Sequence, residues 1–284
     1  MEEGTMERFE VPTRVGPVPV RAAGTGTTVL AVHGALVDGR LWDGVAEGLT
    51  PHARVLLPDL PLGAHRRAVP DRGRLTPPDL AGALVDVLDA VGVDRAVLVG
   101  NDTGGALAQV VVAAAPQRVG GLVLAGCDAF EHFPPPLLRP LPRLAAVPGV
   151  TRLVVRSFAV PALLADPGRL NLFSHRGLGR PLVADLLRPA RTDRAVRADL
   201  TALLRAVRPE PLLAAAGTLG SWGGPAAVVW GRRDRVFPPR DAVRLADLLG
   251  TTVTWLDDAL TFVPVDRPDA VADAVRGVLA ATAA

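Results

Sequence analysis

The chain has 284 residues, of which 49% are hydrophobic, and this suits one large domain or one domain with an inserted lid. The net charge is only +2 and the arginines are scattered among acidic residues, which argues against a nucleic-acid-binding surface. No apolar run reaches the roughly 18 residues that span a bilayer, and Cys127, the single cysteine, excludes an intrachain disulfide. We therefore expect a cytoplasmic protein, and the sequence leaves its oligomeric state open.

The predicted elements alternate between strands and helices along most of the chain. Two edge strands at 7–14 and 18–24 form a hairpin, and the continuous apolar run 27–34 is typical of a strand buried on both faces. There follow a helix at 41–49, a strand at 53–61, a helix at 76–92, a strand at 95–102, a helix at 103–117, a strand at 119–128 and, after a break, a strand at 225–234, a helix at 238–250, a strand at 251–259 and a helix at 267–282. This order predicts an α/β protein whose mostly parallel sheet has helices on both faces.

Residues 130–219 break the alternation, because they are helical or rich in proline and lie between two strands of one sheet. Ligands of such sheets bind outside the carboxyl ends of the strands, so we interpret this segment as a helical lid over a pocket. The core then consists of 1–129 and 220–284. A surface elaboration without function is the alternative. The Leu, Val, Pro and Phe content of the lid predicts a largely apolar pocket.

The turn at 100–104, Gly-Asn-Asp-Thr-Gly, joins a predicted strand to a predicted helix and has Asp102 at its tip. This is the nucleophile-elbow pattern, in which small residues flank the attacking residue because its strained backbone leaves no room for side chains. The start of the following helix offers N–H groups that favour an ionised carboxylate. An ordinary turn with Asp as the helix N-cap is the alternative. We expect the flanking Asn101 and Thr103 to position a polar substrate group.

Four stretches, 32–42, the elbow, 228–238 and 257–271, occur in an order that resembles the α/β-hydrolase superfamily, specifically its Asp-nucleophile branch of haloalkane dehalogenases and epoxide hydrolases. The resemblance covers nearly the whole chain outside the lid. It implies an α/β-hydrolase fold with Asp102 as nucleophile. It also implies an oxyanion hole formed by the backbone N–H groups of Ala35 and Thr103. The acid that orients the catalytic histidine would be either Asp234 or Asp128.

The histidine that this family places near the end of the chain is missing. Its position in the aligning triplet is occupied by Thr261. An Asp nucleophile forms an alkyl-enzyme ester, and a His–acid pair then activates the water that hydrolyses it, whereas threonine takes no proton at neutral pH. Either another base substitutes or turnover avoids a hydrolysed ester. His132 and His175, both in the predicted lid, are the candidate replacements.

The subfamily markers are missing as well. Haloalkane dehalogenases hold the departing halide with side chains at the positions of Ala35 and Thr103, and epoxide hydrolases use lid tyrosines, which this chain lacks entirely. We expect His33 to hydrogen-bond the oxyanion loop. The residues predicted to surround the pocket are His33, Trp42, Asn101, His175, Thr261 and Phe262.

Three functions remain open. The first is a hydrolase acting on a small, largely apolar electrophile, with Asp102 attacking carbon and another base assisting water. The second is a lyase, isomerase or cyclase in which Asp102 is a general base and the missing histidine prevents stray hydrolysis. The third is a catalytically silent binding protein, which the retained elbow argues against. The family resemblance favours the first and Thr261 the second. We expect a small-molecule substrate, with no cofactor, metal, nucleic acid or membrane as partner.

Overall fold

The protein is described by a computed structural model that covers residues 6–158 and 173–283. Within these residues, eight strands form one sheet in the order β1-β2-β4-β3-β5-β6-β7-β8. The strands are β1 (Glu7–Thr13), β2 (Gly16–Ala23), β3 (Thr28–Val32), β4 (Arg54–Pro58), β5 (Ala96–Asp102), β6 (Val119–Cys127), β7 (Ala226–Gly231) and β8 (Val253–Leu256). β1 and β2 form the predicted antiparallel hairpin, β2 is antiparallel to β4, and the other pairs are parallel.

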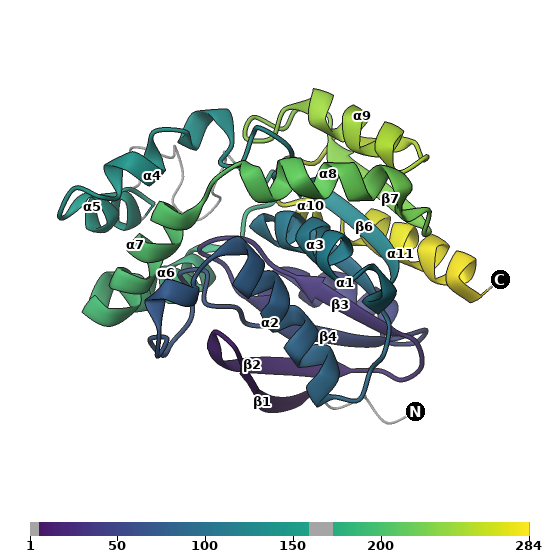
Figure 1. Ribbon diagram of the computed structural model, residues 1–284, viewed down its shortest axis with the longest axis horizontal. Coiled ribbons are helices and arrows are strands. Elements are labelled where there is room, and N and C mark those ends of the chain that lie inside the picture. The colour runs from purple at the N-terminus through teal and green to yellow at the C-terminus, as the bar shows by residue number, and fades with distance from the viewer. Residues whose placement is uncertain (1–5, 159–172, 284) are drawn as a thin grey trace.

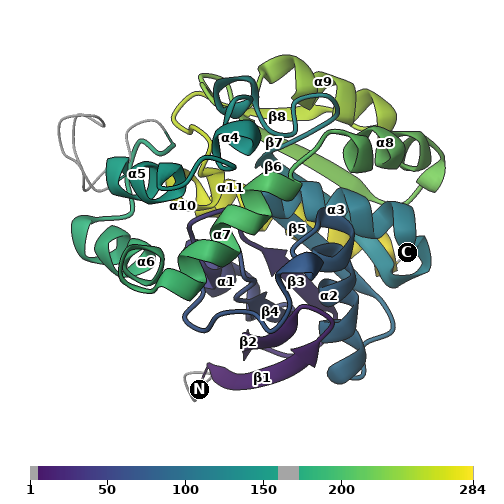
Figure 2. The same ribbon diagram turned by 60° about the vertical axis from the view of Figure 1, so that its left-hand side comes forward.

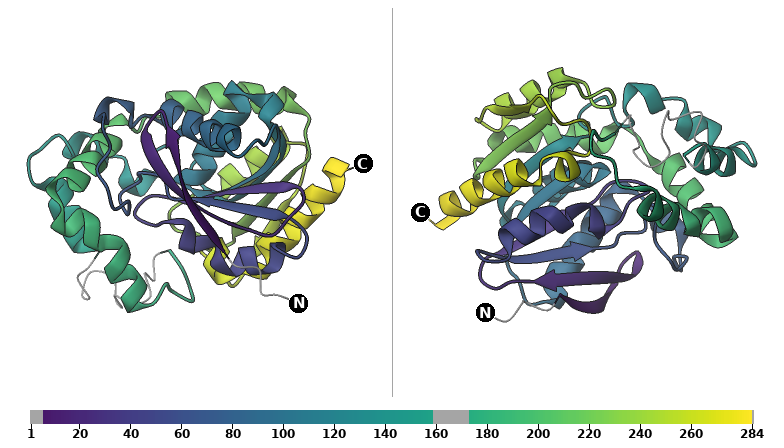
Figure 3. Two further views of the ribbon diagram at one scale, coloured as in Figure 1. Left: turned by 90° about the horizontal axis from the view of Figure 1, so that it is seen from below. Right: turned by 180° about the vertical axis from the view of Figure 1, so that it is seen from behind.

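Helices cover both faces of the sheet, as the alternating pattern predicts. The helices are α1 (Asp43–Leu49), α2 (Pro77–Ala90), α3 (Thr103–Ala114), α4 (Leu141–Leu144), α5 (Val150–Ser157), α6 (Arg180–Thr192), α7 (Arg194–Ala206), α8 (Glu210–Trp222), α9 (Pro239–Leu248), α10 (Val263–Asp266) and α11 (Pro268–Ala283). Figure 1 shows α2, α3 and α8 in front of the sheet, and Figure 3 shows α1 and α11 on the opposite face. None of the described helices is long and apolar enough to cross a membrane.

The central strands are buried because helices cover them on both sides, and their apolar residues suit that burial. Every residue of β3 and β6 is buried, and so is every residue of β5 except Asp102 at its end. One core cluster joins the sheet to α2, α3, α8 and α9, and a second joins it to α1 and α11. Continuous apolar runs are the sequence pattern of strands buried on both faces. The sheet therefore holds the end of β5 in a rigid, closely packed setting.

Helices α4, α5, α6 and α7, which we call the cap, stand beyond the carboxyl ends of the central strands (Figures 1 and 2). The predicted lid, 130–219, also included α8, but the structure packs α8 against α3 of the core. The reason is the buried face of α8, formed by Leu212, Ala215 and Leu219, which matches the small-residue surface of α3. The lid prediction for 159–172 lies outside the described residues.

Candidate active site

The turn between β5 and α3 is a strained elbow. Asp102 has φ 56° and ψ −133°, a backbone conformation that side-chain-bearing residues rarely adopt. A Cβ atom on Gly100 would overlap the backbone of Gly104 and Gly105, and one on Gly104 would overlap the backbone of Val32. The glycine spacing of the sequence is therefore a direct consequence of close packing around Asp102.

The carboxylate of Asp102 is fixed by backbone donors. The N–H of Thr103 donates to Asp102 Oδ1 at 2.7 Å, and the N–H of Ala35 also hydrogen-bonds the carboxylate. Gly34 makes this approach possible, because a Cβ there would collide with the Asp102 side chain. The two groups predicted as the oxyanion hole thus contact Asp102 itself.

A cavity of about 320 Å³ lies between this elbow and the cap. Its lining is apolar except at Asp102, Thr103, Asp128 and Ser157. The described residues that line the cavity include no His or Arg. None of them therefore places a cation beside the carboxyl groups of Asp102 and Asp128. The described part of the chain also contains no cluster of three or more His, Cys, Asp or Glu side chains that could hold a metal ion.

The two carboxyl groups lie at the ends of neighbouring strands. Asp102 pairs with Cys127 across β5 and β6, which places Asp128 directly beside it. Burial raises the pKa of Asp102 to about 7, against the opposing hydrogen bonds from Thr103. Burial likewise raises the pKa of Asp128 well above its ordinary value, and the negative charge of Asp102 adds to the rise. The cavity floor therefore carries two carboxyl groups with unusually high proton affinity.

Thr261 is hydrogen-bonded to Asp234, one of the two acids considered from the sequence. Its hydroxyl donates to Asp234 Oδ1 at 2.8 Å, and the same oxygen accepts from the N–H groups of Val236 and Phe237. Burial raises the pKa of Asp234 to about 6. Neither Thr261 nor Asp234 lines the cavity, although Thr261 was predicted to do so. The Thr261 hydroxyl thus binds Asp234 outside the lining of the cavity.

Neither lid histidine reaches the cavity, which corrects the prediction that one of them replaces the missing base. His132 Nδ1 lies 2.6 Å from Asp241 Oδ2, and its Nε2 lies 3.0 Å from an Arg240 nitrogen. Both partners of His132 belong to α9, so its side chain points to that helix. His175 is exposed on the surface.

Three further residues predicted around the pocket are structural. His33 accepts from the N–H of Leu60 through Nε2, so its Nδ1 carries the proton and donates to Gly34 O, which holds the oxyanion loop. Asn101 Nδ2 donates to the carbonyls of Gly126 and Thr261 and ties β5 to the segment after β8. Trp42 is fully buried in the core. None of the three lines the cavity.

Phe262 does line the cavity, as predicted, and stacks on Phe173 with ring centroids 5.4 Å apart. Sequence reasoning missed most of the cap wall. Leu200, Leu203 and Val207, at the end of α7, line the cavity at the spacing of one helical face. That spacing identifies an apolar face, but not the surface that it covers.

The strand order and the elbow between β5 and α3 are those of the α/β-hydrolase class of enzymes. The chain belongs to the alpha/beta hydrolase fold family, whose sequence model matches residues 27–266. The predicted fold class is thereby confirmed.

Individual relatives have diverse activities. The chain is 28% identical over 260 residues to 2-hydroxy-6-oxo-6-phenylhexa-2,4-dienoate hydrolase of Burkholderia cepacia, with 86% of each chain covered. It is 26% identical over 259 residues to haloalkane dehalogenase 2 of Mycobacterium tuberculosis, with 89% of this chain and 87% of the relative covered. These relatives support an α/β-hydrolase enzyme.

Solved structures show the same fold. Haloalkane dehalogenase DbeA from Bradyrhizobium elkani has a TM-score of 0.81 at 21% identity, over 98% of this chain and 99% of that one. A thermophilic esterase from Thermogutta terrifontis has a TM-score of 0.70 at 21% identity, over 97% of this chain and 99% of that one. Both likenesses concern the fold alone.

Proposed function

We propose that the protein is a hydrolase in which Asp102 forms an ester with a small, largely apolar electrophile and water then cleaves that ester. The observation that carries this proposal is the Asp102 carboxylate, fixed by two backbone N–H groups on the floor of an apolar cavity. A cavity of about 320 Å³ suits a small organic molecule. An apolar wall binds such a molecule and leaves the attacking carboxylate weakly hydrated.

The backbone donors serve both steps of this reaction. In the first step an Asp102 oxygen bonds to a substrate carbon, and the leaving group departs with its electron pair. In the second step water adds to the ester carbonyl, whose oxygen becomes negative, and the alcohol is expelled as Asp102 is restored. The N–H groups of Ala35 and Thr103 are positioned to stabilise that negative oxygen.

A second candidate function is proton transfer by a lyase, isomerase or cyclase. Two observations favour it: burial raises the pKa of Asp102 to about 7, which suits a general base, and Thr261 leaves the cavity without a histidine to activate water. In that reaction Asp102 removes a proton from carbon, no ester forms, and no oxygen from water enters the product.

A single-turnover experiment in water labelled with heavy oxygen separates these functions. We expect small bromoalkanes or epoxides to add their mass to the Asp102 peptide, and one labelled oxygen to enter the Asp102 carboxyl after hydrolysis. The matched control is Asp102→Asn, which should give no adduct. Turnover in which the Asp102 peptide gains neither the mass of the probe nor a labelled oxygen supports proton transfer instead. Reversible binding of these probes without turnover or adduct supports a binding protein.

The variant Thr261→His gives a second test of the same proposal. It places an imidazole beside Asp234, as in the resembling dehalogenases. If the ester accumulates because its hydrolysis is slow, this variant should shorten the lifetime of the adduct. If Asp102 is only a general base, the variant should leave the product unchanged.

A further inference from the structure

We propose that Asp128 is the acid and base of this site, giving a proton to an oxygen leaving group and then taking one from the water that cleaves the Asp102 ester. This inference rests on the proposed function of Asp102. It assigns Asp128 a direct part in proton transfer. The family resemblance had implied only that an acid at this position orients a histidine.

Geometry brings Asp128 to the reacting atoms. It follows the last residue of β6, which pairs with Asp102 at the end of β5, and both carboxyl groups line the same cavity. The Thr103 hydroxyl lies 3.3 Å from Asp102 Oδ1 and also interacts with Asp128, so it stands between the two. Asp128 Oδ1 is buried and has no hydrogen-bond partner within the described chain. That oxygen is available to a water or a substrate atom.

The other acid–base groups are unavailable. Of the titratable side chains in the described residues, only Asp102 and Asp128 line the cavity. Asp234 does not line the cavity, and both ring nitrogens of His132 are engaged outside it. Asp128 is therefore the one described side chain besides the nucleophile that can move a proton at the substrate.

The charges around Asp128 set its state at each step. Asp102 and Asp241 both face it with negative charge, and the Thr103 hydroxyl opposes their effect. Because backbone donors stabilise the ionised form of Asp102, the pair starts as a carboxylate at Asp102 and an acid at Asp128. Formation of the ester removes the charge of Asp102, so the pKa of Asp128 falls when a base is needed.

The proton balance closes on this pair of carboxyl groups. Asp102 attacks carbon, the carbon–oxygen bond of an epoxide or similar ether breaks, and the proton of Asp128 goes to the released oxygen. Ionised Asp128 then takes a proton from water as its hydroxide adds to the ester carbonyl. Collapse of this intermediate expels the alcohol oxygen, which takes the proton of the newly formed Asp102 acid. Asp128 keeps the proton from water, and both groups return to their initial states.

Two probes with one carbon skeleton test this scheme: styrene oxide, whose leaving oxygen needs a proton, and 2-phenylethyl bromide, whose bromide does not. In Asp128→Asn we expect the bromide to form the Asp102 ester at the wild-type rate. The epoxide should form it about 10²-fold or more slowly. Either ester should be cleaved about 10²–10⁴-fold more slowly, because after bromide leaves, Asp128 releases its proton to solvent and then acts as the same base. Quenched-flow mass spectrometry of the Asp102 peptide measures both steps.

Two further variants distinguish a chemical role from a structural one. Asp128→Ala with added formate should regain ester cleavage, whereas a folding defect would not respond to formate. Asp199→Asn is the matched control, since it alters a buried acid on α7 that does not line the cavity, and ester cleavage should stay near wild type.

The outcomes separate the two proposals. If wild-type protein forms the ester and Asp128→Asn cleaves it at the wild-type rate, the role of Asp128 is overturned and the nucleophile stands. Equal slowing of ester formation from both probes would also overturn the acid role. If substrate is consumed without any ester in wild type or variants, the proposed function itself fails.

Discussion

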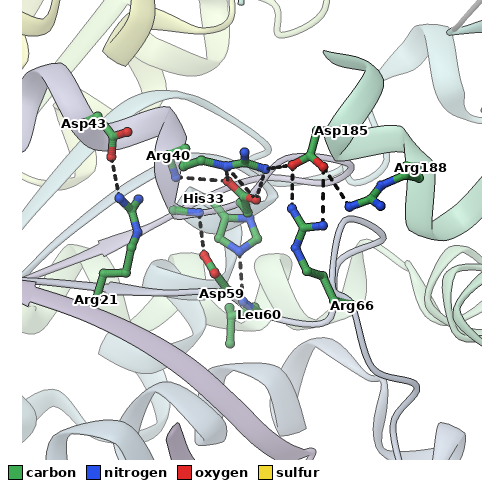
Figure 4. A network of polar contacts seen from close by, with 11 residues as sticks. Arg21, His33, Arg40, Asp43, Asp59, Leu60, Arg66, Asp185 and Arg188 are labelled. Atoms are coloured by element: carbon green, nitrogen blue, oxygen red, sulfur yellow. Dashed lines mark hydrogen bonds and ion pairs between the residues drawn. The ribbon is translucent and has the colours of Figure 1, made fainter. Parts of the chain in front are cut away.

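Carboxyl groups behave in opposite ways at the cavity floor and at the junction between cap and core. Asp185 on α6 bonds Arg40 and Arg66 of the core and Arg188 of its own helix (Figure 4). The hydrogen bond from the Arg66 guanidinium contributes most to lowering the pKa of Asp185 to about 2, and the bond from Arg40 adds to it. At the cavity floor, where no cationic side chain of the described residues is in contact, burial raises the pKa of Asp102 to about 7.

A second junction carboxylate, Asp199, also has several polar partners and is buried. Asp199 on α7 accepts from Arg72 Nε at 2.6 Å and from the Val69 N–H, and it contacts His65 at 3.2 Å. It is fully buried and still has polar partners on both oxygens. The difference between the two regions is the supply of donors, and burial alone does not explain it.

The comparison between Asp185 and Asp102 shows how neighbouring cations and burial set the pKa of a carboxyl group. Arginine neighbours lower the pKa of Asp185 and keep it ionised, which suits a permanent link between cap and core. Such a neighbour at the floor would hold both carboxyl groups ionised and prevent the proton exchange that we propose. The regions are connected, because Arg40 also bonds Asp38, which lies three residues after Ala35 of the cavity lining.

The largest effect should come from removing the Asp102 carboxylate. Asp102→Asn should lower turnover at least about 10³-fold, because an amide oxygen is a poor nucleophile. Its melting temperature should be unchanged or higher, since a buried ionisable group in a strained site reduces stability. Steady-state kinetics and thermal unfolding check both parts. Full activity in this variant would contradict every catalytic role given to the elbow.

At the junction, Asp199→Ala should lower the free energy of unfolding by about 2–4 kcal/mol. The reason is that the Val69 N–H and the Arg72 guanidinium lose their acceptor. Urea unfolding measures the loss. Asp199→Asn should lose less, since the amide oxygen still accepts one hydrogen bond. Equal stability of the alanine variant and wild type would mean that this link contributes nothing.

The raised pKa values of the floor predict a stability that falls with pH. Between about pH 4 and 7 the native Asp102 keeps a proton that the unfolded chain has lost, so its stabilising contribution disappears as pH rises through about 7. One such group gives a slope of up to about 1.4 kcal/mol per pH unit. Denaturation at several pH values should show a shallower fall in Asp102→Asn than in wild type. Identical slopes would refute the raised pKa.

The smallest effect should come from the exposed part of the junction. Asp185→Ala should cost less than about 1 kcal/mol, because partly exposed ion pairs are weak and screened. The difference from wild type should shrink further at high salt. Urea unfolding at two salt concentrations tests this, and a loss as large as that of Asp199→Ala would erase the contrast between exposed and buried links.

The fold could be predicted from the sequence because it depends on local patterns of apolar residues and glycines. Apolar runs identified the buried strands, and alternation with helices indicated a parallel sheet. The glycines at 100 and 104 identified the elbow, because close backbone approach restricts residue choice at fixed spacing. The end of the lid was misplaced because the apolar face of α8 does not reveal whether it covers the cavity or α3.

The sequence by itself determined that Asp102 stands at an elbow, and the family resemblance implied a histidine at the position of Thr261. Only the tertiary structure decided where the remaining polar groups point: it bonds Asp234 to Thr261, directs His132 to Asp241 and places Asp128 in the lining of the cavity. The physical reason is that elbow strain is local to a few residues. The surroundings of a carboxyl group, by contrast, depend on which donors distant segments bring to it.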